Sequence, residues 1–223
     1  MMPALLSAGL PPHLALGTNK LQSFCGVSTA LRNYRRGGLV ELRPNLGLVA
    51  VVFAGAGAGA LIVRALPGDV LKLVVPVLLF GAALYILLSP RMSDEDAHQR
   101  LGKRGYDPVA GGIGFDDGFF GPGTGTFCTA SLVGLRGLGL TRAAAHTKLF
   151  NATSNLAALL VFAMGGQVLW LLGLCMAVGA MVGGWFGSHT AMRPGARLIR
   201  PLLVASSMAL TARLAWNWYV GQG

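Results

Sequence analysis

A glycine-rich break interrupts one of the apolar stretches of this chain. Residues 116–127 read DDGFFGPGTGTF, and the next apolar stretch carries Lys148, Asn151 and Asn155. In hydrocarbon, each unpaired backbone N–H or C=O costs several kcal/mol. Irregular backbone is therefore tolerated at membrane depth only where protein buries it or a water-filled cavity contacts it. If the surrounding stretches cross a membrane, this pattern predicts a transport pathway.

The composition indicates that these stretches do cross a membrane. Of the 223 residues, 53% are hydrophobic and only 12% are charged, which is typical of chains covered by lipid. A bilayer core needs roughly 20 apolar residues per helix. Six windows are long enough: 12–34, 44–66, 68–89, 141–164, 168–192 and 196–220. We therefore expect an all-α, polytopic helix bundle in which a further window, 108–136, is broken by its glycines.

The net charge of +10 does not indicate nucleic acid. The basic residues fall between the apolar windows rather than along one soluble face, as the positive-inside rule predicts for a membrane protein. The chain has no GxxxxGK[ST] motif, so nucleotide-driven pumping by this chain alone is not expected.

Neither an enzyme nor a cofactor is expected. The three cysteines, Cys25, Cys128 and Cys175, lack C-x-x-C spacing and a neighbouring histidine cluster, so we predict no metal site and no disulfide. An enzyme would need a convergent acid/base or nucleophile set. The best available set, His146 with Asp116 or Asp117, is weak, and we predict no catalytic residues.

The sequence also repeats itself. A shift of 128 residues places Lys20 on Lys148 and residues 37–38, a glycine pair, on the glycine pair 165–166. Duplicated halves are common in secondary transporters, whose substrate site then lies near the midplane between the repeats. We predict a first repeat over 1–89, a cytoplasmic linker over 90–107 and a second repeat over 108–220.

Equivalent loops carry unequal numbers of basic residues, which favours inverted halves. The loop near residues 165–166 has no basic residue, whereas its first-half counterpart holds Arg32, Arg35, Arg36 and Arg43. Opposite orientation requires segment 108–136 to begin and end on the cytoplasmic side. We therefore predict a re-entrant hairpin that turns at residues 121–125.

The first repeat is expected to be incomplete at its N-terminus. The shift of 128 maps residues 118–127 to positions before Met1, so the first half has no counterpart of the glycine-rich hairpin. Two explanations stay open: translation starts upstream of Met1, or the gene product is shortened. In either case one wall of the substrate site is expected to be missing.

Two motifs resemble the signature region of the sulfite exporter TauE/SafE family, also called the toluene-sulfonate uptake permease family. They are GFFGPGTGTF (118–127) and AHTKLFNATSN (145–155), and the resemblance runs through most of the chain. It implies a multi-pass permease of the bacterial inner membrane that moves a small sulfur-containing anion such as sulfite or an organosulfonate. The alternative is a non-transporting or truncated membrane component of the same family.

The two lysines in register are the leading candidates for an anion site. A lysine inside a membrane helix costs at least about 2.5 kcal/mol unless it is paired or snorkels, so Lys20 and Lys148 suggest a shared purpose; snorkelling to the headgroups is the structural alternative. Neutral polar neighbours complete the predicted substrate-binding set: Asn19, His146, Asn151 and Asn155. Such a polar stripe also serves as interhelical glue.

The glycine-rich turn and two carboxylates complete the prediction. Gly121, Gly123, Thr124 and Gly125 offer backbone N–H groups and the positive end of a restarting half-helix, which suits anions in transporters; tight helix packing is the alternative. The acids before the turn, Asp116 and Asp117, are candidates for proton coupling, with a capping or interfacial role as the alternative.

Overall fold

The computed structural model describes residues 2–67, 70 and 101–192, and in these ranges the chain is helical. Four predicted windows correspond to helices: 12–34, 44–66, 141–164 and 168–192. Windows 68–89 and 196–220 lie outside the described residues. The helices are α1 (Met2–Ser7), α2 (Pro12–Arg36), α3 (Leu46–Ala65), α5 (Lys103–Phe119), α6 (Thr124–Arg136), α7 (Leu140–Met164) and α8 (Trp170–Met192), with a 3-10 turn η1 (Arg43–Asn45) before α3.

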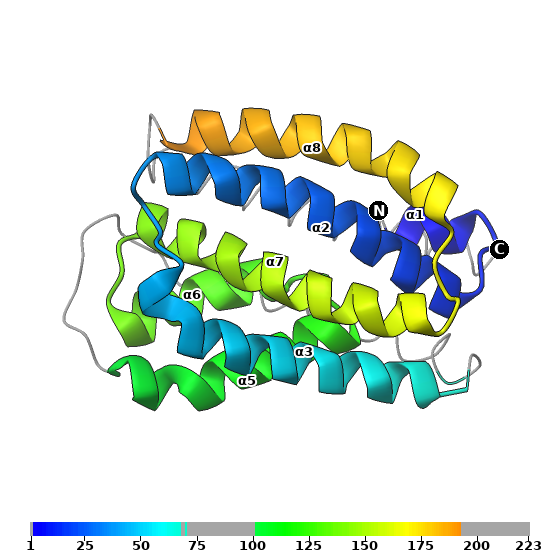
Figure 1. Ribbon diagram of the computed structural model, residues 1–223, viewed down its shortest axis with the longest axis horizontal. Helices are drawn as coiled ribbons and strands as arrows, with labels where there is room; N and C mark the ends of the chain where they lie inside the picture. The colour runs from blue at the N-terminus through cyan, green and yellow to red at the C-terminus, as the bar shows by residue number, and fades with distance from the viewer. Residues whose placement is uncertain (1, 68–69, 71–100, 193–223) are drawn as a thin grey trace, which may run out of the picture.

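Helices α2 and α7 form the centre of the bundle (Figure 1). α8 packs on the outer side of α2, and α3 packs against α7 and carries α5. α2 and α7 run in opposite directions, and so do α3 and α8 (Figure 1). By length and apolar content, the described segments Arg43–Ala65 and Trp170–Met192 qualify as membrane spans. α2 and α7 are more polar because they hold the lysines and amides that face other helices.

Two apolar clusters fill the bundle. One gathers around Leu16 and Phe162, where α2 meets α7. The other gathers around Tyr106, Leu132 and Phe150 and joins α5, α6 and α7. The second cluster buries the facing sides of the two short helices, so they are part of the packed bundle rather than a surface loop.

The predicted break lies inside the glycine cluster. α5 ends at Phe119 and α6 begins at Thr124, with Gly121 (φ 94°) and Gly123 (φ 91°) in left-handed conformations between them. The turn is therefore shorter than the predicted 121–125, because Thr124 and Gly125 already belong to α6. α5 begins at Lys103, inside the predicted linker 90–107; the linker residues up to 100 lie outside the described residues.

Helices α2 and α7 match in length and in the turns that flank them. α2 and α7 each have 25 residues, and both boundaries of α7 lie 128 residues after those of α2. The glycines before these helices, Gly9 and Gly137, have φ values of 82° and 66°, and those after them, Gly38 and Gly166, have 70° and 66°. Equivalent positions therefore make the same turns.

Backbone-to-backbone packing joins α3 to α5. A Cβ added to Gly55 would overlap the carbonyl of Gly111, and a Cβ added to Gly118 would overlap the carbonyl of Ala56. The absence of side chains at these points lets the two helices approach closely, as in other membrane helix pairs. Gly55 on α3 and Gly118 on α5 therefore serve the packing of these two helices.

Candidate functional site

Lys20 lies at the centre of the bundle, on α2. Its side chain is 1% exposed, and its ammonium lies 3.2 Å from Oδ1 of Asp117. The same ammonium donates to the backbone carbonyl of Asp117. The pair joins α2 to the last turn of α5 and gives the buried cation the anionic partner that it needs in a low-dielectric setting.

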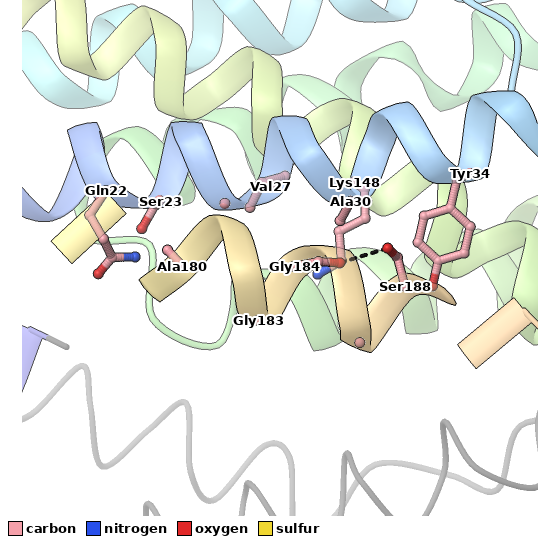
Figure 2. A pocket seen from close by; sticks show the side chains of 12 residues that line it. Gln22, Ser23, Val27, Ala30, Tyr34, Lys148, Ala180, Gly183, Gly184 and Ser188 are labelled. Carbon is pink, nitrogen blue, oxygen red and sulfur yellow. Dashed lines mark hydrogen bonds between the residues drawn. The ribbon is translucent and has the colours of Figure 1, made fainter. Parts of the chain in front are cut away.

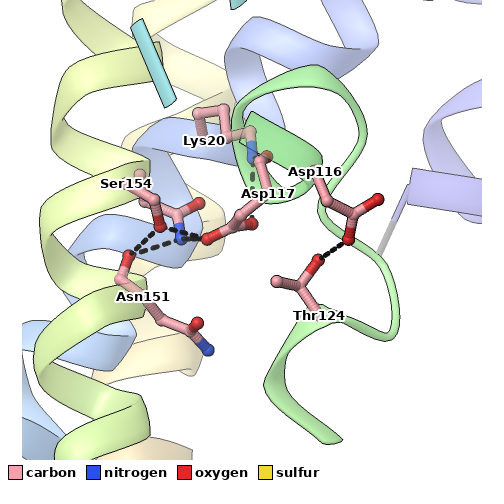
Figure 3. Close-up of polar contacts among 7 residues, drawn as sticks. Lys20, Asp116, Asp117, Thr124, Asn151 and Ser154 are labelled. Carbon is pink, nitrogen blue, oxygen red and sulfur yellow. Dashed lines mark hydrogen bonds and ion pairs between the residues drawn. The ribbon is translucent and has the colours of Figure 1, made fainter. Parts of the chain in front are cut away.

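The carboxylate of Asp117 has further partners on α7 (Figure 3). Ser154 Oγ donates to Oδ2, and Asn155 Nδ2 lies 3.3 Å from the same oxygen. Asn155 also donates to the carbonyl of Asn151 at 2.7 Å, which fixes its amide in place. Asp117 therefore ties the hairpin to both central helices, and we call Lys20, Asp117, Ser154 and Asn155 the polar cluster.

Asp116 has a different position from its neighbour. Successive residues on a helix point about 100° apart, so Asp116 faces outward while Asp117 faces the core. Its Oδ2 accepts a hydrogen bond of 2.7 Å from Thr124 Oγ1, across the glycine turn (Figure 3). This bond fastens the end of α5 to the start of α6.

The glycine turn lies directly over the polar cluster. A Cβ added to Gly121 would come within 2.9 Å of both Lys20 Nζ and Asp117 Oδ1. The N–H groups of Gly121 and Thr124 donate to carbonyls of Asp116 and Gly121, so these two are already used within the turn. A Cβ added to Gly125 would lie 3.3 Å from the amide nitrogen of Asn151, which brings α6 against α7.

Lys148 occupies different surroundings from its counterpart Lys20. It is half-buried on α7 and lines a cavity of about 360 Å³ between α2 and α8 (Figure 2). The polar groups around this cavity include Gln22, Tyr34 and Ser188. In the part of the chain that the structure describes, Lys148 has no hydrogen bond and no ion pair.

Of the remaining predicted residues, some lie beside the hairpin and others do not. Asn151 and Asn155 lie beside the hairpin, as expected for one face of α7. Asn19 is half-buried on α2, next to Lys20 in the chain. His146 bonds the carbonyl of Arg142 in its own helix at 2.9 Å, and the structure does not bring it to the polar cluster.

Three further residues make contacts at the site. Ser154, one of the neutral donors that the sequence places beside Asn155, contacts Asp117 directly. Thr129 and Thr147 share a hydrogen bond of 2.9 Å between α6 and α7. This contact joins two hydroxyls on different helices, and spacing along one helix does not reveal it.

The sequence comparisons agree on one family. The family model for the sulfite exporter TauE/SafE matches residues 1–214. A probable membrane transporter protein of Sinorhizobium sp. is 46% identical over 214 residues, covering 96% of this chain and 82% of the relative. One from Escherichia coli K12 is 41% identical over 217 residues (97% and 81%), and one from Haemophilus influenzae is 40% identical over 221 residues (98% and 87%). No solved structure matches the chain.

Proposed function

The chain belongs to the sulfite exporter TauE/SafE family, and from this membership we propose that it is a secondary transporter for a small sulfur-containing anion, such as sulfite or an organosulfonate. It is a multi-pass helical membrane protein, and we place it in the bacterial inner membrane. The observation that carries the proposal is the polar cluster, in which a buried lysine meets a carboxylate at the tip of a broken helical hairpin.

The location of Lys20 supports an anion site. A lysine at the centre of a membrane helix costs about 2.5–3.5 kcal/mol on insertion scales, and replacing a buried ion pair by apolar residues is often neutral or stabilising. A purely structural cluster would therefore gain little stability from the charge of Lys20. A site in which the ammonium exchanges one anionic partner for another requires that charge.

Charge balance suggests how the anion would be coupled to protons. Lys20 and Asp117 together carry no net charge, so a second anion at Lys20 would leave an uncompensated negative charge in the bundle. Protonation of Asp117 removes its charge and releases the ammonium to bind the incoming anion. Each monovalent anion would then enter with one proton, and the loaded site would carry no net charge. Asp116 is the second candidate for proton coupling; it lies at the hairpin tip, where it accepts a hydrogen bond from Thr124.

The fold supplies the elements for alternating access. We take the α5–α6 pair as the re-entrant hairpin, since α6 ends on the same side of the bundle as α5 begins (Figure 1). α2 and α7 are then equivalent helices of two inverted repeats, related by the 128-residue shift. A rigid-body movement of one group of helices against the rest would expose the polar cluster to each side in turn.

A non-transporting membrane component of the same family is the second candidate. The open cavity beside Lys148 favours it, because in the described part of the chain no carboxylate-bearing wall closes this side as α5 closes the other. An enzyme is less well supported, because His146 bonds within its own helix rather than joining Asp116 or Asp117.

Flux measurements test the proposal. Purified protein in proteoliposomes would be supplied with labelled sulfite or a labelled alkanesulfonate. The variants are Lys20→Gln and Lys148→Gln, with the exposed loop substitution Arg43→Gln as the control. We expect flux in the parent and the control and a collapse in both lysine variants. Absence of flux from monodisperse, helical protein, or lysine variants as active as the parent, would contradict the proposal.

A further inference from the structure

The cavity between α2 and α8 holds a lysine that the polar cluster does not use. Lys148 lies between Gln22 and Tyr34 along this cavity (Figure 2). None of the described residues that line the cavity carries a carboxylate, and among them Lys148 forms no ion pair. Charged groups in confined surroundings are normally paired, so this ammonium needs an anion that the described chain does not supply.

The cavity is large enough for an anion with part of its hydration water. Its volume of about 360 Å³ falls within the range of about 300–1,000 Å³ that is usual for small-molecule sites. A Cβ added to Gly183 or Gly187 meets no atom of the described chain within 4 Å, so the glycines of α8 keep this space free. The amide oxygen of Gln22 is buried in the lining and has no hydrogen-bond partner among the described residues. A water molecule that accompanies the anion would satisfy it.

The surroundings of Lys20 are the opposite. Its side chain is 1% exposed and paired with Asp117, and a Cβ added to Gly121 would come within 2.9 Å of its ammonium. An anion can replace Asp117 there only after the hairpin moves and the carboxylate is protonated. Lys148 requires neither step, because its cavity has free space and it has no carboxylate partner to release.

Few groups near Lys148 can change their charge. Tyr34 lines the cavity from α2, and Cys128 on α6 and Asp117 on α5 are close enough to act on Lys148 electrostatically. The part of α8 that lines the cavity has no titratable side chain. Tyrosine and cysteine are ordinarily protonated at neutral pH, and Asp117 is paired with Lys20. An anion at Lys148 therefore needs no accompanying proton at neutral pH.

The cavity extends toward a basic end of the bundle. α2 and α8 end there and α7 begins there (Figure 1), and the lining residues Tyr34 and Ser188 lie near the ends of α2 and α8. The same end of α2 carries three exposed arginines, Arg32, Arg35 and Arg36. Clustered positive charge raises the local concentration of anions, so this end of the bundle is suited to loading the cavity.

From these observations we propose that the α2–α8 cavity is a separate site for a small, singly charged oxyanion, which Lys148 binds together with part of the hydration water of the anion and without a proton. The proposal rests on the proposed function, which it divides into two steps. The anion first fills the α2–α8 cavity from the basic end. A later, proton-dependent step brings it to Lys20 and the polar cluster.

Calorimetric binding tests the proposal. The probe is methanesulfonate, whose single charge does not change near neutral pH, and it is added to the purified chain in detergent at neutral pH. We expect one bound anion per chain in the parent, in Lys20→Gln and in Lys148→Arg. Lys148→Gln should lose affinity roughly tenfold or more, since no other cation lines the described cavity. Absence of binding in the parent, full binding in Lys148→Gln, or binding that requires acid pH or Lys20 would overturn the proposal.

Thiol labelling gives a second readout that leaves Lys20 unchanged. A cysteine replaces Gly183, in a background with the three native cysteines changed to alanine, and reacts with sulfonatoethyl or with trimethylammonium-ethyl methanethiosulfonate. Lys148→Gln should lower the ratio of the anionic to the cationic rate roughly fivefold, whereas the exposed-site control Arg43→Gln should leave the ratio unchanged. Excess methanesulfonate should slow both reagents. An unlabelled cysteine, or a ratio indifferent to Lys148, would contradict the proposal.

The two assays separate this site from the transport proposal, because neither of them measures flux. A chain that binds methanesulfonate through Lys148 but shows no flux would keep the site and contradict transport. Flux that depends on Lys20, together with no binding through Lys148, would contradict the site alone.

Discussion

The ammonium of Lys20 and the carboxylate of Asp117 lie 3.2 Å apart, although 97 residues separate them in the chain. Both side chains are almost fully buried. This contact fastens the tip of the α5–α6 hairpin to α2, and it places a buried pair of opposite charges beside the point where the helix is broken.

Removing one member of this pair should be more harmful than removing both. Lys20→Met leaves the carboxylate buried without its cation, and such losses typically cost about 3–5 kcal/mol. The double variant Lys20→Met with Asp117→Asn should recover most of that loss. Unfolding in detergent, followed by circular dichroism, gives the coupling energy from the four proteins. Lys148→Met is the matched control, and a loss as large as that of Lys20→Met would argue against the pair as the cause.

Ser154 should contribute mainly through Asp117, although its hydroxyl also lies 3.2 Å from the carbonyl of Asn151. Ser154→Ala removes a donor to the carboxylate, and hydrogen bonds to charged groups contribute about 1.5–3 kcal/mol. The neighbouring Thr153→Val is the control, because its hydroxyl bonds only the carbonyl of Leu149 in its own helix. We expect a lower thermal midpoint for Ser154→Ala than for the control. In an Asp117→Asn background the difference should shrink, and an unchanged difference would separate Ser154 from the carboxylate.

The α3–α5 contact should not accept a methyl group. Gly118→Ala places a Cβ against the backbone of Ala56, and overpacking of this kind costs about 1–3 kcal/mol. Gly112→Ala on the same helix meets open space and should stabilise α5 by about 0.5–1 kcal/mol through helix propensity. Thermal unfolding of the two variants checks the prediction, and equal midpoints would show that α3 and α5 are not in close contact.

Proton coupling should depend on Asp117 rather than Asp116. Asp117→Asn keeps the position neutral, as in the protonated state, so an imposed pH gradient should no longer accelerate anion uptake into proteoliposomes. Asp116→Asn removes a charge but keeps an oxygen that can accept the hydrogen bond from Thr124, and it leaves the partner of Lys20 in place, so its flux should still respond to the gradient. A gradient response that survives in Asp117→Asn would assign the coupling to another group.

The helices and their break were predictable because they depend on local sequence. The uninterrupted apolar windows gave α2, α3, α7 and α8 to within a few residues. The glycine cluster gave the position of the turn, since Gly121 and Gly123 adopt backbone angles that other residues rarely accept. The repeat itself stays a prediction, although Lys20 and Lys148 stand at matching places in helices of equal length.

The contacts of the site were not predictable in the same way. Which of two adjacent acids meets Lys20 depends on the rotation of α5 about its axis, and tertiary packing sets that rotation. The differing surroundings of Lys20 and Lys148 depend on which helix covers each of them. His146 was predicted at the site as a polar neighbour of Lys148 in the chain, yet its ring bonds the carbonyl of Arg142. The sequence shows which side chains share one face of a helix, but it does not show which other helix packs against that face.

The glycine contacts between α3 and α5 also limit how the protein can move. Carbonyls of each helix lie against glycines of the other. A small axial slide of one helix along the other would therefore bring backbone atoms into steric overlap. A conformational cycle must therefore carry α3 and α5 as one rigid unit. The hinge must therefore lie at another contact between helices.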